Sequence, residues 1–312
     1  MPTTRRARTL LLAAMIAVPM TSGFSAPALA SVPAAVPTAP AAPAAPEQQS
    51  VSERYAATGV HDVTSVAVPG YQVFYPTDID TSPDLHPVVT FGNGSYATYE
   101  QYEELLRHLA SWGFVVVVAD SSVTGDGTEI LAAARYILAQ NDNPESVFHD
   151  RIDVAHVAAV GHSQGAGGSI NASTHSDGLI TSTAVLDLPD PWWASRPVDV
   201  IDVARLTAPV FYLTGSDDPV STAIPQAAYH AVSPVPAARG RLLGVGHDWP
   251  SDGGGFRGYL TAWLRFTLTD EHRRRTRLRG SGTRAVGRST VGRDRGQGVV
   301  TGPFLPKRGP AT

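Results

Sequence analysis

The chain has 312 residues, a formal net charge of −4 at pH 7 and no cysteine. The absence of cysteine excludes structural disulfides, thiolate catalysis and cysteine-ligated metal sites. The length admits one or two domains, and a folded body of about 220 residues can bury a sufficient core without disulfides.

The first 50 residues predict an export signal followed by a linker. Residues 1–30 start with arginines, continue through the apolar run 10–18 and end in Ala28-Leu29-Ala30, a small-residue cleavage site. The apolar run is too short for a membrane-spanning helix. Residues 31–50 are rich in Ala and Pro, which favours a disordered linker. We therefore expect a secreted protein whose folded domain spans residues 51–269.

Within this body the pattern alternates between strands and helices. Continuous valines in 114–119 are typical of a strand buried on both sides of a parallel sheet, and apolar residues at helical spacing predict helices. The expected strands are 71–75, 88–91, 114–119, 154–160, 183–188, 210–214 and 241–245, and the expected helices are 99–111, 128–140, 166–173 and 256–268. This order predicts an α/β fold, a mostly parallel central sheet with helices on both faces and catalytic residues at the C-terminal strand ends.

In hydrolases of the α/β class, one of the two backbone N–H groups that stabilise the oxyanion comes from the loop after an early strand. Strand 88–91 is followed by such a loop in this chain. Gly92-Asn93-Gly94-Ser95-Tyr96 is placed for this role, because glycines let the backbone approach a substrate carbonyl. We expect the donor to be the N–H group of Ser95. Tyr96 is the alternative donor, one residue on, and is expected in the substrate site. The competing interpretation is an ordinary Gly-Asn turn.

The candidate nucleophile is Ser163, in Gly161-His162-Ser163-Gln164-Gly165. A Gly-x-Ser-x-Gly turn between strand and helix raises the serine hydroxyl above the sheet, and the N–H of the next residue, Gln164, then faces the oxyanion. In a chain with 29 glycines the pattern alone is only suggestive, and the predicted strand before it and small-residue helix after it make it specific. The side chain of His162 is expected to point elsewhere on the turn.

The acid and base of a Ser-His-Asp triad are expected at later strand ends, in the chain order Ser, Asp, His. His247, between the last predicted strand and the last helix, is the candidate base. Asp218 is the favoured acid, since a carboxylate at the end of strand 210–214 can orient the base. Asp217 is the alternative, and Asp187 a third candidate. No pair of histidines has metal-ligand spacing beside a glutamate, and no phosphate loop is present, so we expect no metal and no cofactor.

Residues 270–312 differ sharply from the body in charge. They hold 11 Arg and Lys against 3 Asp and Glu, whereas residues 31–269 hold 10 Arg against 25 Asp and Glu. The basic tail lacks a periodic apolar face, so it is expected to be disordered. The alternatives are adhesion to an anionic polymer or nucleic acid and a segment outside the native reading frame. The acidic body favours a soluble monomer, and we expect no nucleic-acid partner and no membrane span.

Three segments resemble bacterial polyester hydrolases and cutinases: Pro87–Gly94, Leu109–Val116 and Gly161–Gly168. This branch includes poly(ethylene terephthalate)-degrading enzymes and their chlorophyllase-like and dienelactone-hydrolase-like relatives, and the similarity covers roughly residues 65–268. It implies an α/β-hydrolase fold without a large cap domain. The residues it implies are Ser163, Asp218 and His247 as triad, with Ser95 and Gln164 as oxyanion donors. The chain departs from the branch in lacking a C-terminal disulfide and in having Ser95 where an aromatic residue is usual.

The same resemblance implies a tryptophan in the acyl pocket, after the sixth strand. Asp190-Pro191-Trp192-Trp193 offers two candidates, and Trp192 is the favoured substrate wall. The alternative is interior packing of both indoles.

Together these features predict a secreted serine carboxylic-ester hydrolase that forms an acyl-enzyme. Its expected substrate is a small-molecule or polymeric ester, including polyesters and cutin-like or lipidic esters. One alternative is an amidase or peptidase with the same triad, although the short segment 174–209 leaves little room for a peptide-recognising cap. The other is a binding protein on a hydrolase scaffold, which the ordered triad positions argue against.

Overall fold

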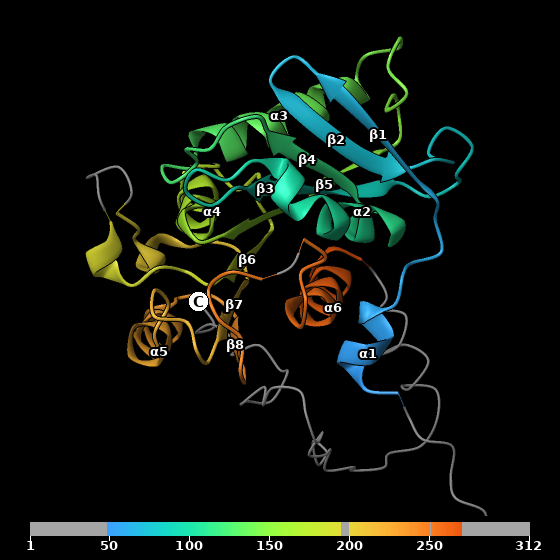
Figure 1. The fold of residues 1–312 in the computed structure, drawn as a ribbon. Coiled ribbons are helices and arrows are strands. Elements are labelled where there is room, and N and C mark those ends of the chain that lie inside the picture. The colour runs from blue at the N-terminus through green and yellow to red at the C-terminus, as the bar shows by residue number, and fades with distance from the viewer. Residues whose placement is uncertain (1–48, 195–199, 250, 270–312) are drawn as a thin grey trace, which may run out of the picture. The chain divides into compact units, whose positions relative to one another are not determined.

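The computed structural model describes residues 49–194, 200–249 and 251–269. These residues form one eight-stranded sheet flanked by helices (Figure 1). The strand order is β1-β2-β4-β3-β5-β6-β7-β8, in which β2 pairs antiparallel with both β1 and β4 and all other neighbours are parallel. The strands are β1 (Val63–Val68), β2 (Tyr71–Pro76), β3 (His86–Gly92), β4 (Val115–Ala119), β5 (Ile152–His162), β6 (Ser182–Leu186), β7 (Val210–Gly215) and β8 (Ala237–Leu242). The predicted mostly parallel sheet is confirmed.

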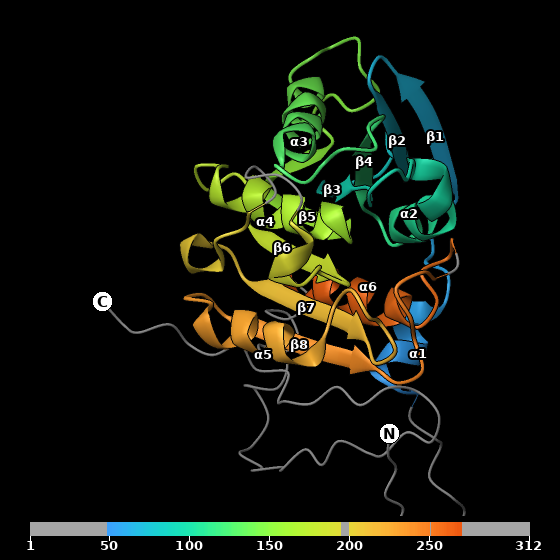
Figure 2. The same ribbon diagram turned by 60° about the vertical axis from the view of Figure 1, so that its left-hand side comes forward.

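Helices cover both faces of the sheet, as Figure 2 shows. One face carries α2 and α6, and the opposite face carries α3, α4 and α5. The helices are α1 (Val51–Ala56), α2 (Glu103–Ser111), α3 (Thr128–Asn141), α4 (Gln164–Thr174), α5 (Ala223–Val232) and α6 (Phe256–Leu268), with short 3₁₀ turns η1 (Tyr99–Tyr102), η2 (Pro191–Trp193) and η4 (Val203–Arg205). The segment between β6 and β7 contains only short turns in its described part, so no large cap covers the sheet there.

The valines of β4 explain how a single strand supports both layers. Successive side chains of a strand point to opposite faces. Val116 and Val118 pack with α2 and α6, whereas Val115 and Val117 pack under α3. All four are fully buried. A continuous apolar run is therefore what this central strand needs, as the sequence pattern predicts.

The sequence pattern misplaces or misses several peripheral elements. The last strand, β8, occupies Ala237–Leu242 rather than the predicted 241–245, because an edge strand can carry Arg239 and Arg241 and so lacks the expected apolar run. The edge strand β1 and the helices α1 and α5 were not predicted. Pro225 lies in the first turn of α5, where the missing N–H breaks no helical hydrogen bond.

The domain begins with a well-defined cap. Ser50, which the sequence pattern assigns to the linker, accepts the N–H of Glu53, and the Glu53 carboxylate accepts the N–H of Ser50, so the two form a capping box on α1. The predicted signal, nearly all of the linker and the basic tail lie outside the described residues. Within those residues, no helix is both long and apolar enough to cross a bilayer.

Candidate active site

Ser163 lies on the turn between β5 and α4, with φ 55° and ψ −123°. A positive φ is strained for a residue with a side chain, and such strain persists only where the surroundings enforce it. Close packing enforces it here: a Cβ on Gly165 would lie 2.1 Å from the Gly92 carbonyl oxygen, and one on Gly161 would lie 2.1 Å from that of Gly165. The two flanking glycines are therefore required by backbone contact between β3, β5 and α4.

The structure brings Ser163, His247 and Asp218 together. His247 Nε2 lies 2.8 Å from Ser163 Oγ, and His247 Nδ1 lies 2.8 Å from Asp218 Oδ2. The other carboxylate oxygen of Asp218 accepts the N–H groups of Val220 at 2.7 Å and Ser221 at 3.1 Å. The carboxylate of the alternative acid, Asp217, instead accepts the neighbouring Ser216 hydroxyl and forms no hydrogen bond with His247 among the described residues. This is the geometry that a Ser-His-Asp triad requires.

Electrostatics favour the ionised acid and a strengthened base. Burial raises the pKa of Asp218, but the hydrogen bonds from His247 and Val220, with that of Ser221, outweigh it and leave the pKa below its ordinary value. Burial likewise lowers the pKa of His247, but the hydrogen bond and the charge of Asp218 outweigh it and leave the pKa above 6.5. The carboxylate therefore stabilises the imidazolium form of His247.

Two residues that line the cavity at Ser163 have a backbone N–H group with no acceptor among the described residues. Among the described residues, neither Ser95 N–H nor Gln164 N–H is donated to a protein group, and both residues line the same cavity as Ser163. The N–H of Tyr96, the alternative donor, is already bonded to Ser122 O at 3.3 Å. Two free donors beside a serine hydroxyl are what an oxyanion hole supplies.

The cavity above Ser163 has a volume of about 360 Å³. Its apolar wall includes Leu188, Ile201 and Trp193, and His247 lies at its edge. The favoured tryptophan was Trp192, but the structure places Trp193 in the wall and leaves Trp192 out, with 66% of its surface exposed. Both sit on the single turn η2, where neighbouring side chains diverge, so only one can face the cavity. Tyr96 is 94% exposed and does not line the cavity.

His162 is part of the site, contrary to the expectation from the sequence. Its Nε2 lies 3.0 Å from the carbonyl oxygen of His247, and its Nδ1 lies 3.0 Å from the hydroxyl of Tyr102, which also accepts the N–H of Gly94 at 3.1 Å. Burial, followed by the nearby His247, lowers the pKa of His162 to about 3. The neutral ring therefore accepts from Tyr102 and donates to His247, which joins the Gly94 loop to the backbone of the histidine loop.

Replacing Tyr102 with phenylalanine should destabilise the protein, because it leaves two buried groups, Gly94 N–H and His162 Nδ1, without a partner. Each such group costs about 1–3 kcal/mol. Urea unfolding followed by circular dichroism measures the loss. Tyr71→Phe is the matched control, since Tyr71 packs on Tyr136 through its ring and its hydroxyl has no partner among the described residues. Equal stability of the two variants would contradict a bridging role for Tyr102.

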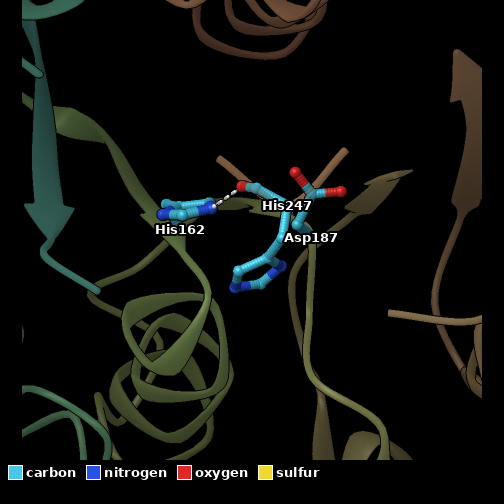
Figure 3. A group of neighbouring side chains, drawn as sticks. All are labelled: His162, Asp187 and His247. Atoms are coloured by element: carbon cyan, nitrogen blue, oxygen red, sulfur yellow. Dashed lines mark hydrogen bonds between the residues drawn. The ribbon is translucent and has the colours of Figure 1, made fainter. Parts of the chain in front are cut away.

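The side chains of His162, Asp187 and His247 gather closely enough to resemble a metal site, as Figure 3 shows. One nitrogen or oxygen of each lies within 4.8 Å of the others. Each side chain is nevertheless already hydrogen-bonded to protein. His247 bonds the serine and the acid, His162 bonds Tyr102 and a carbonyl, and Asp187 accepts two N–H groups. Protein partners therefore account for the cluster without a metal.

Comparison with known proteins gives the family of this chain. A family model described as PETase: PET hydrolase-like matches residues 31–286. Cutinase est2 of Thermobifida alba is 28% identical over 226 residues, 69% of each chain. Bis(hydroxyethyl) terephthalate hydrolase of Streptomyces coelicolor is 34% identical over 119 residues, 36% of each chain. Cutinase 2 of Thermobifida cellulosilytica is 27% identical over 142 residues, 44% of this chain and 50% of the relative. The chain therefore belongs to the PET hydrolase-like family, and it is a carboxylic ester hydrolase with an α/β-hydrolase fold.

Proposed function

We propose that this ester hydrolase is secreted and works through a Ser163–His247–Asp218 triad and an acyl-enzyme intermediate. The observation that carries the proposal is the continuous hydrogen-bond path from Ser163 Oγ through the two nitrogens of His247 to the buried Asp218 carboxylate. Secretion rests on the signal-like residues 1–30.

The reaction proceeds by two acyl transfers. His247 takes the proton of Ser163 as Oγ attacks the ester carbonyl, and Asp218 holds the ring with Nδ1–H towards itself so that Nε2 is free to accept. The oxyanion receives the N–H groups of Ser95 and Gln164. His247 returns the proton to the leaving alcohol. In the second transfer His247 takes a proton from water as the water attacks the acyl-enzyme, and it returns that proton to Ser163 Oγ as the acid leaves.

The substrate is an ester with a compact, largely apolar acyl group, presented as a small molecule or as the end of a polymer chain. A cavity of about 360 Å³ lined by Leu188, Trp193 and Ile201 is in the size range of sites for small ligands. Relatives named as cutinases and as a bis(hydroxyethyl) terephthalate hydrolase support aliphatic and aromatic diesters as the first candidates.

A fluorophosphonate probe tests the nucleophile directly. We expect it to label the wild-type chain at Ser163, which mass spectrometry of the labelled peptide locates, and not to label Ser163→Ala. Rates across p-nitrophenyl esters of increasing acyl length, followed by polyester film, then define the substrate. An unlabelled wild-type chain with intact fold would contradict the proposal and favour a binding protein.

We expect kcat/KM to fall as the pH is lowered, with the midpoint of this fall above pH 6.5. His247 must be neutral to accept the serine proton, and Asp218 holds its pKa above the ordinary 6.5, so the base is lost as the pH drops through that raised value. The measurement is kcat/KM against pH for two esters of different acyl length, which should share the same acidic limb. A limb below pH 6.5 would contradict this assignment of the base.

A further inference from the structure

Asp187 lies between the two loops that carry the acid and the base. It follows β6 directly, with φ 50°, and is completely buried. Its Oδ1 accepts the N–H of Gly215 at the end of β7, at 2.8 Å, and its Oδ2 accepts the indole N–H of Trp249 at 3.1 Å. Gly215 precedes Asp218 by three residues and Trp249 follows His247 by two. One side chain therefore spans both loops, and Figure 3 shows it beside His247.

Two buried carboxyls, Asp187 and Asp218, face one base. His162 and His247 are the other titratable groups in contact range, and His162 is neutral at ordinary pH. Asp218 accepts three N–H donors and Asp187 accepts two. A negative charge is better stabilised on the carboxyl with more donors, so Asp218 is the ionised member of the pair.

The second carboxyl therefore holds a proton at neutral pH. Burial first, and then the charge of Asp218, raise the pKa of Asp187 to about 8, although the Gly215 N–H and the charge of His247 oppose the shift.

We propose that Asp187 is an uncharged positioning residue of the triad, which holds the acid loop at Gly215 and the base loop at Trp249. This inference rests on the proposed triad. It fixes the acid loop against the base loop, and it leaves a single negative charge, that of Asp218, beside the base at neutral pH.

Stability against pH tests the proton without reference to catalysis. A carboxyl whose folded pKa is raised stabilises the protein fully below its unfolded value of 3.8, and this contribution is lost as the pH rises to about 8. Asparagine carries no such proton. The melting temperature of Asp187→Asn relative to wild type should therefore increase steadily from pH 4 to pH 8. Parallel curves would overturn the proposal, whatever the outcome for Ser163.

Kinetics tests the positioning role. Asp187→Leu removes the acceptor of the Gly215 N–H and of the Trp249 indole N–H, and should lower kcat about 10–100-fold with little change in KM, the effect of leaving a buried donor without an acceptor. Asp187→Asn keeps a carbonyl for the Gly215 N–H but turns an NH₂ group, which cannot accept, towards the indole N–H of Trp249, so it should recover only part of that loss. If the leucine variant does not fold, the asparagine variant still carries the test through its pH profile.

Above pH 8 the ionised Asp187 of the wild type places a second negative charge within 4.8 Å of a ring nitrogen of His247. This charge stabilises the imidazolium of the transition state, so kcat should rise further through pH 8, by about fourfold even with water-like screening. Asp187→Asn should lack this rise. Trp249→Phe, which removes the indole donor and keeps the carboxyl, is the matched control and should retain it. A rise that persists in Asp187→Asn would overturn the proposal.

Discussion

Replacing Ser163 with alanine should lower kcat for a short p-nitrophenyl ester by a factor on the order of a million, as expected when a triad nucleophile is removed. The hydroxyl is the group that His247 Nε2 contacts at 2.8 Å, and alanine offers nothing in its place to attack a carbonyl. The fold should persist, because the backbone at this position is bonded through Ser163 N–H to Leu186 O at 3.0 Å, which alanine preserves. Steady-state kinetics and a thermal melt measure the two quantities.

Ser95→Ala is the matched control within the same cavity. The role proposed for Ser95 belongs to its backbone N–H, so losing the hydroxyl should change kcat by less than about threefold, whereas losing a true oxyanion donor costs about 10²–10³-fold. Near-full activity of Ser163→Ala would rule out Ser163 as the nucleophile. A large loss in Ser95→Ala would move the oxyanion contact from the backbone to the side-chain hydroxyl.

The central sheet and the serine turn could be predicted because their determinants are local. The valines of 115–118 specify a strand buried on both faces, and Gly161 and Gly165 permit a turn whose backbone contacts exclude any side chain. Ser163, Asp218 and His247 could be expected to meet because each follows a strand of a parallel sheet, whose carboxyl ends lie at one edge. These features need only the sequence near each residue and a rule of connection.

The remaining features depend on contacts between distant segments. Tyr102 and His162 are 60 residues apart, and nothing in either segment indicates that a hydroxyl will meet an imidazole. From the sequence, Asp187 is only one of several carboxylates at strand ends. Its role depends on its hydrogen bonds with Gly215 and Trp249, which the sequence does not indicate. Trp192 and Trp193 are equivalent in composition, and only the direction of the η2 turn decides which one lines the cavity. Long-range packing, which no periodicity encodes, decides each of these.

Replacing Asp218 with asparagine should lower kcat by about 10⁴-fold while the geometry of the site is kept. The carboxylate has two distinct sides: Oδ1 accepts the N–H groups of Val220 and Ser221, and Oδ2 accepts from His247 Nδ1. In the variant the amide oxygen must stay with the two backbone donors, because an NH₂ group there would face two other donors. The NH₂ group is then directed at His247 Nδ1, which can only accept from it.

That arrangement places the ring proton of neutral His247 on Nε2, towards Ser163, where a base needs a lone pair. The loss therefore arises from the wrong tautomer and not from a disordered histidine, so kcat should fall far more than KM rises. Asp217→Asn is the matched control: its carboxylate bonds only the adjacent Ser216 hydroxyl among the described residues, and its kcat should stay within about twofold of wild type, as for an exposed substitution away from the site. The reverse pattern, with Asp217→Asn inactive and Asp218→Asn active, would transfer the role of the acid to Asp217 and would require the histidine loop to adopt a different position in the working enzyme.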